Sequence, residues 1–118
     1  MNQEVSDAIA KRNKQIAQLD ESIKRADNLK QEINEAIEYL ARANRYFTSA
    51  KYNLEKSYEG KASQIFKNDF VDSIEKVELT ITELKSAIQQ LDAEKTNLSK
   101  KVSNLEHEIT LLLAGYKL

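Results

Sequence analysis

Apolar side chains recur along this chain at alternating intervals of four and three residues, which is the spacing of a coiled-coil seam. Proline is absent from all 118 residues, and neither periodic half contains an internal helix breaker. In the first half the two rows of the seam are Ile9, Ile16, Ile23, Lys30, Ile37, Asn44, Lys51 and Val5, Arg12, Leu19, Ala26, Ile33, Leu40, Phe47, Leu54. In the second half they are Ile74, Ile81, Ile88, Lys95, Val102, Ile109, Tyr116 and Phe70, Val77, Leu84, Leu91, Leu98, Leu105, Leu112. This pattern predicts two long helices that share one apolar seam.

Between the two periodic halves lies a short segment, Ser57 to Ser63, that contains Gly60. Glycine can adopt the left-handed conformation that ends a helix, so we place a chain reversal near Tyr58 to Ala62. The expected fold is all-α: one antiparallel, coiled-coil-like two-helix hairpin that forms a single domain over residues 1–118. Its helices are expected at about residues 3–57 and 63–115, with the turn at 58–62.

An antiparallel hairpin that reverses at this position brings together residues whose numbers add up to about 121. Every apolar layer closes in this register. The predicted layers pair Ile9 with Leu112, Ile16 with Leu105, Leu19 with Val102, Ile23 with Leu98, Ile33 with Ile88, Ile37 with Leu84 and Leu40 with Ile81.

Two layers contain a lysine: Lys95 faces Ala26, and Lys30 faces Leu91. One interpretation is a polar layer that fixes the register or opens when a partner binds. The other is that both lysines lie along the edge of the seam with hydrated ammonium groups. The seam is thin, and this favours the second interpretation.

Composition argues against several functional classes. The 18 basic and 19 acidic side chains nearly cancel, so no field is expected that would attract nucleic acid. Without cysteine, neither a disulfide nor a thiolate metal site can form. No apolar run approaches the ~18 residues of a membrane span. The N-terminal residues lack the basic and apolar regions of a classical signal peptide, so export by the general pathway is not expected.

Residues with catalytic potential are few. The only histidine, His107, lies between two glutamates on the expected outer face, with no histidine or cysteine one helical turn away. A hydrated surface histidine is therefore expected. No G-x-S-x-G elbow, P-loop or glycine-rich phosphate loop is present. We expect no enzyme, no catalytic or cofactor-binding residues, and no metal site.

A second apolar strip lies on the turn-proximal half of the first helix. We call these residues the second strip: Ala36, Tyr39, Ala43, Tyr46, Phe47 and Ala50. Its alanines recur every seven residues and let another helix approach closely, and its tyrosines supply amphipathic contact area. The alternative is that this end of the hairpin is better packed, with the tyrosines lying over Phe70 and Ile74. The opposing stretch adds only Leu79 to its own seam, so we interpret the second strip as a partner-binding face.

The residues from Tyr58 to Phe66 resemble the turn of the WXG (ESAT-like) family of type VII secretion systems. That family has a Trp-x-Gly turn, followed by a small residue and a phenylalanine that open the second helix. Here Tyr58 stands in place of the tryptophan, Gly60 is the glycine, Ala62 is the small residue and Phe66 is the aromatic residue. The similarity in architecture covers the whole chain, and the motif covers nine residues.

The residues Tyr116-Lys117-Leu118 do not contain the Tyr-x-x-x-Asp or Tyr-x-x-x-Glu export signal of core members of that family. The chain is therefore most similar to the small WXG-like helical partners of LXG toxins. This resemblance implies a targeting adaptor or small substrate that docks on the helical N-terminal region of a toxin. It implies a cytoplasmic location before export, secretion by a type VII system, and contact with the secretion ATPase through the complex.

Two further classes compete with a hetero-oligomeric partner. The first is a self-associating structural coiled coil that uses the same strip to form a homodimeric four-helix bundle. Stable homodimerisation that persists when a candidate partner is added would distinguish it. The second is a prefoldin-like holdase, but such proteins assemble through β-hairpins, and the sequence has no segment with a period of two. We rank it last.

Overall fold

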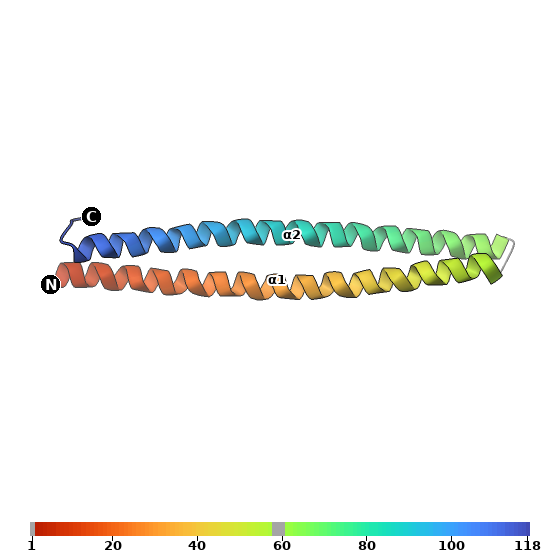
Figure 1. Ribbon diagram of the computed structural model, residues 1–118, viewed down its shortest axis with the longest axis horizontal. Helices are drawn as coiled ribbons and strands as arrows, with labels where there is room; N and C mark the ends of the chain where they lie inside the picture. The colour runs from red at the N-terminus through yellow and green to blue at the C-terminus, as the bar shows by residue number, and fades with distance from the viewer. Residues whose placement is uncertain (1, 58–60) are drawn as a thin grey trace. The chain divides into compact units, whose positions relative to one another are not determined.

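The structure, a computed structural model, describes residues 2–57 and 61–118, and side chains over residues 2–56 and 64–118. The described chain forms two α-helices, α1 (Gln3–Ser57) and α2 (Lys61–Leu113), which pack against each other (Figure 1). The predicted all-α, antiparallel two-helix fold is confirmed. The predicted turn residues Tyr58 and Gly60 lie outside the described residues. Ala62 lies in the first turn of α2, and its side chain is outside the described part.

The helix ends follow from local capping. Helix α1 begins where predicted, because the side-chain oxygen of Asn2 accepts a hydrogen bond of 2.8 Å from the backbone N–H of Val5. Helix α2 begins two residues earlier than predicted and ends at Leu113, before the predicted 115. Gly115, with φ of 95°, ends it, and the Tyr116 N–H donates to the Leu111 carbonyl over 3.0 Å. The placement of Tyr116 on the seam is therefore wrong, and its side chain is exposed.

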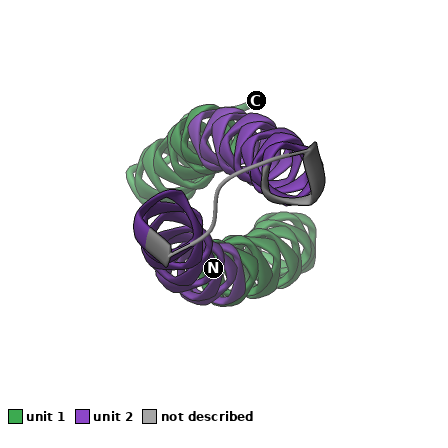
Figure 2. Cartoon of the chain, turned by 90° about the vertical axis from the view of Figure 1, so that its right-hand side faces the viewer, with its two compact units in different colours: residues 1–30, 90–118 green, residues 31–89 purple. Residues whose placement is uncertain are grey.

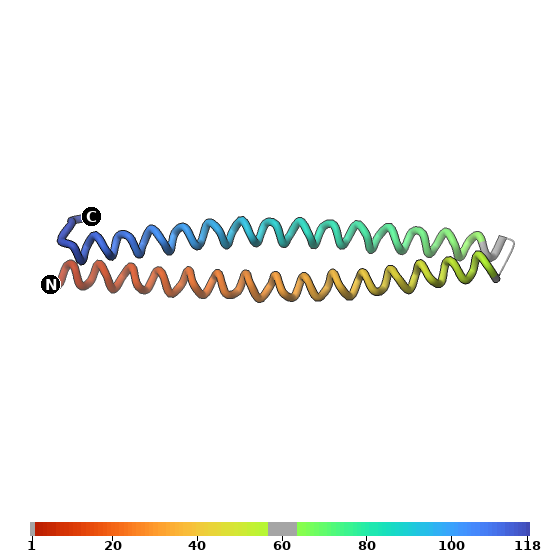
Figure 3. Tube along the Cα trace, in the orientation of Figure 1, coloured from red at the N-terminus to blue at the C-terminus, as the bar shows by residue number. Residues whose placement is uncertain are grey.

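The chain divides into two compact units (Figure 2), and each helix contributes a segment to both of them. Unit 1 contains residues 1–30 and 90–118, and unit 2 contains residues 31–89. In each unit the α1 segment and the α2 segment lie side by side (Figure 3). The assignment of residues 1–118 to one domain stays a prediction.

The register of unit 1 is given by three ion pairs between α1 and α2. Arg12 Nε lies 3.7 Å from a carboxylate oxygen of Glu108, and Lys30 Nζ lies 2.9 Å from Asp92. The third pair joins Lys95 of α2 to Asp27 of α1. The residue numbers of the first two pairs add up to 120 and 122, so the helices are antiparallel and within one residue of the predicted register.

Unit 2 has the same antiparallel arrangement. The side-chain amide of Asn44 donates a hydrogen bond of 3.3 Å to the backbone carbonyl of Ile74. Near the end of α1, Oε1 of Glu55 forms an ion pair with Nζ of Lys67 on α2, at 3.7 Å. These numbers add up to 118 and 122, so the pairing again lies within one helical turn of the predicted register.

The core is thin in both units. Every predicted seam position from Val5 to Leu54 and from Phe70 to Leu112 is buried or half-buried, which confirms both seam rows within the helices. Only Ala26, Leu98 and Leu112 are buried among the hydrophobic side chains described, and all three belong to unit 1. A pair of helices that buries so little is consistent with a protein that packs against partners.

Candidate partner-binding face

The six residues of the second strip all lie on the α1 segment of unit 2. Tyr39 and Tyr46 are 72% and 79% exposed, more than any other large hydrophobic side chain described. Ala36 is exposed, whereas Ala43 and Ala50 are half-buried beside the seam. Helical spacing sets each tyrosine three or four residues from two of the alanines, so the tyrosines form a ridge along a row of small side chains.

Phe47 differs from the rest of the second strip because it belongs to the seam. Its ring lies 6.3 Å from that of Phe70 on α2, measured between centroids, and its side chain is half-buried. The tyrosines do not share this packing. Their exposure does not fit the alternative in which they lie over Phe70 and Ile74.

Helix α2 contributes small residues to the same side of the seam, which were not among the residues predicted for this face. The antiparallel register places Ser73 near Ala50 and Ala87 near Ala36, and both α2 residues are half-buried. Thr80 lies between them at the same heptad position and is exposed. The signal was available as a spacing of seven residues on α2, but it is visible only when both helices are considered together.

The second strip borders a polar surface of α1. Tyr46 lines a shallow hollow of about 350 Å³ together with Arg42, Arg45 and Ser49. Arg42 also approaches Glu38 one turn earlier, at 4.0 Å. Guanidinium groups beside an exposed phenol ring provide hydrogen-bond donors at the edge of the apolar ridge, which is the arrangement of an interface rim.

Exposed large apolar side chains are more numerous in unit 2 than in unit 1. Of the ten large hydrophobic residues that are exposed in the described chain, six belong to this unit: Tyr39, Tyr46, Tyr52, Ile65, Phe66 and Leu79. Phe66, the aromatic residue of the predicted turn motif, is 55% exposed. The ammonium group of Lys56 lies over the Tyr52 ring, 4.7 Å from its centroid, in a cation–π contact. Unit 2 is therefore the better candidate for contact with another protein.

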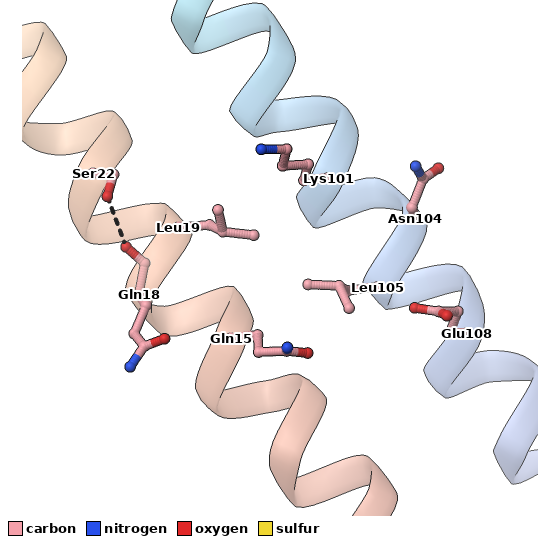
Figure 4. Close-up of a pocket in the computed structure, with 8 residues that line it drawn as sticks. All are labelled: Gln15, Gln18, Leu19, Ser22, Lys101, Asn104, Leu105 and Glu108. Atoms are coloured by element: carbon pink, nitrogen blue, oxygen red, sulfur yellow. Dashed lines mark hydrogen bonds between the residues drawn. The ribbon is translucent and has the colours of Figure 1, made fainter. Parts of the chain in front are cut away.

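Unit 1 has a groove between its helix segments. Leu19 and Leu105 point toward each other at its centre (Figure 4), and the hollow has a volume of about 480 Å³. Its rim carries amides and two charged side chains: Gln15, Gln18, Lys101, Asn104 and Glu108. Within the described residues no three His, Cys, Asp or Glu side chains are grouped to hold a metal ion. His107 is exposed, as predicted.

No family model, curated protein or solved structure matches this chain. The similarity to the WXG family is therefore carried only by the turn residues and the two-helix architecture. Over the described residues, neither helix has a stretch apolar enough to cross a membrane.

Proposed function

We propose that the chain is a non-catalytic helical interaction protein that docks another α-helical protein on the second strip of unit 2. The observation that carries this proposal is the exposure of Tyr39 and Tyr46 beside a row of alanines. Tyrosine supplies a large, rigid contact area at a low cost in side-chain entropy, and alanine allows close approach of a helix. Isolated exposed apolar residues are normal on protein surfaces, but a ridge along one helix face is typical of an interface.

The more specific form of the proposal is a WXG-like adaptor. In this form the partner is the helical N-terminal region of an LXG toxin, and the complex is targeted to a type VII secretion ATPase. The antiparallel helix pair and the residues Tyr58, Gly60, Ala62 and Phe66 support it. On this proposal the chain is cytoplasmic before export and carries out no reaction.

The alternative is a homodimeric four-helix bundle through the same strip. It is favoured by the alternation of small and large side chains at positions 36, 39, 43, 46 and 50, which follows the three-four spacing of a second seam. In an antiparallel pairing of two such segments, each tyrosine of one copy lies over an alanine of the other.

The test compares Tyr39→Ala combined with Tyr46→Ala against Tyr52→Ala, an exposed tyrosine outside the second strip. Each protein is mixed with a helical protein encoded beside this one, and affinity and mass are measured by calorimetry and light scattering. The double substitution is expected to cost about 2 kcal/mol or more in binding, and Tyr52→Ala less than about 0.5 kcal/mol. Because all three side chains are exposed, helicity should not change.

Three other outcomes would contradict this proposal in different ways. A homodimer that persists when the candidate is added, and that the double substitution dissociates, would establish the alternative. A chain that stays monomeric and binds none of the helical proteins encoded by neighbouring genes would contradict both the hetero-oligomeric proposal and the homodimeric alternative. A complex that the double substitution leaves intact would place the interface elsewhere.

A further inference from the structure

The two seam lysines of unit 1 are each paired with an aspartate of the opposite helix. Lys30 Nζ lies 2.9 Å from Asp92 Oδ1, and Lys95 Nζ forms the corresponding hydrogen-bonded ion pair with Asp27 Oδ1. The lysine side chains are about one-third exposed and the aspartates about half exposed. The lysines lie at the partly exposed edge of the seam, as expected, and each ammonium group also has a carboxylate partner there, which was not expected.

The two ion pairs are reciprocal. In each helix the aspartate precedes the lysine by three residues, and the numbers of each pair add up to 122. We call these four residues the clasp: Asp27, Lys30, Asp92 and Lys95. The hydrogen bond to Asp27, opposed in part by desolvation, raises the pKa of Lys95 above its ordinary value of 10.5. Both pairs form together in only one alignment of the two helices.

The apolar rows alone do not define that alignment well. Because the rows repeat every seven residues, a shift of one heptad still sets Ile16 against a leucine, either Leu98 or Leu112 instead of Leu105. The hydrogen bond of Asn44 does not discriminate either, since it ends on a backbone carbonyl and every register offers one. Hydrophobic burial therefore leaves neighbouring registers in competition.

Charges in unit 1 separate the registers. A shift that lowers the sum by seven moves Lys30 from Asp92 to the position of Lys85. The same shift moves Arg12 from Glu108 to the position of Lys101. Both changes replace an opposite charge by a like charge, whereas Lys95 moves from Asp27 to the position of Asp20 and keeps a carboxylate partner. Two like-charge contacts against one retained pair disfavour this register.

The opposite shift removes partners without adding repulsion. It moves Lys30 to the position of Ser99 and Lys95 to the position of Asn34. Both lysines then lie at seam positions without a carboxylate partner, so neither ion pair of the clasp stabilises this register. A polar residue at a core position of a coiled coil is known to specify register in this way.

We propose that the clasp fixes the register of the helix pair in unit 1, because both of its ion pairs form together in only one alignment. This role is independent of any partner, so its test needs only the chain itself.

The chain has no cysteine, so disulfides can report the register without background. Ile16→Cys with Leu105→Cys reports the native alignment, and Ile16→Cys with Leu98→Cys or Leu112→Cys reports the shifted ones. Each pair is introduced with the clasp intact and with Lys30→Met and Lys95→Met. At low protein concentration in glutathione buffer, gel mobility measures the intramolecular disulfide, and circular dichroism measures helicity.

With the clasp intact, only the native pair should form a disulfide in appreciable yield. With both lysines replaced by methionine, we expect helicity to be retained and the preference for the native over the shifted disulfides to fall by about tenfold or more. An unchanged preference in the methionine variant would overturn the proposal and assign the register to the turn.

A charge exchange provides the second test. Lys95→Asp alone opposes Asp27 with a like charge and should weaken the preference. Adding Asp27→Lys restores an ion pair of reversed polarity and should recover the preference for the native disulfide. If Lys95→Asp leaves the preference for the native register unchanged, pairing of these charges does not set it and the proposal is wrong.

Discussion

The rings of Phe47 on α1 and Phe70 on α2 lie 6.3 Å apart between centroids and are inclined by 42° to each other. Tilted aromatic pairs at this separation interact favourably beyond the area they bury. Phe47→Leu and Phe70→Leu should each lower the free energy of unfolding by about 1 kcal/mol, with a coupling of about 0.5 to 1.5 kcal/mol in the double-mutant cycle. Urea denaturation of the four proteins measures it, and strictly additive effects would show that the rings do not interact.

Two leucines of α2 differ in how deeply they are buried. Leu98 is 8% exposed, whereas Leu79 is 61% exposed. Leu98→Ala should lower the free energy of unfolding by about 2 to 4 kcal/mol, because it removes packed methyl groups and leaves a cavity. Leu79→Ala is the matched control and should change stability by less than about 0.5 kcal/mol. Equal effects in thermal denaturation would contradict the packing of α2 described for both units.

The fold could be predicted because heptad spacing states directly which side chains face the seam. The rows that contain Leu19, Ala26 and Leu98 are buried or half-buried as the spacing requires. Local chemistry that depends on backbone conformation was harder to foresee. The sequence pattern continued α2 to residue 115, whereas Gly115 takes a positive φ and ends the helix earlier.

The clasp was missed for a geometric reason. Directly across the seam, the predicted register sets Ala26 opposite Lys95 and Leu91 opposite Lys30. A long side chain reaches instead to a flanking position of the opposite helix, where the aspartates lie. The exposure of Tyr39 and Tyr46 did follow from helical phase. The protein that would contact these tyrosines could not be predicted, because the sequence of one chain contains only one side of an interface.

Asn44 is an incompletely satisfied polar group in the seam of unit 2. Its Nδ2 donates to the Ile74 carbonyl, but its buried Oδ1 has no hydrogen-bond partner among the described residues. Asn44→Ile should raise the free energy of unfolding by about 1 kcal/mol or more, because it removes this desolvation cost and adds an isoleucine to the seam row after Ile37. Asn34→Ile, at an exposed position, is the control and should have little effect in urea denaturation. A destabilised Asn44→Ile protein would show that the amide makes a net favourable contribution.

Gly115 should be sensitive to substitution for a backbone reason alone. A methyl group added at its Cα would meet no atom within 4 Å, yet its φ of 95° is disfavoured for residues with a side chain. Gly115→Ala should therefore cost about 1 kcal/mol, and Gly115→Asn less, since asparagine tolerates this conformation better. Hydrogen exchange of the Tyr116 amide, which donates to Leu111, should accelerate in the alanine variant. Equal stability of the alanine variant and the unsubstituted protein would contradict this cap.

The clasp also predicts how stability depends on alkaline pH. The Asp27 hydrogen bond raises the pKa of Lys95 above 10.5, so the folded chain holds this proton more tightly than the unfolded chain. The stabilisation that results is fully present below about pH 10.5 and is lost as the pH rises through the folded pKa. The difference in free energy of unfolding between the unsubstituted protein and Lys95→Met should therefore be constant from about pH 8 to 10 and should decrease above that range. Comparing the two variants cancels the contribution of other groups that titrate in this pH range. In an Asp27→Asn background the decrease should be smaller, because the main cause of the raised pKa of Lys95 is removed. A difference that stays constant or grows up to about pH 12 would mean that Lys95 does not hold its proton more tightly in the folded chain.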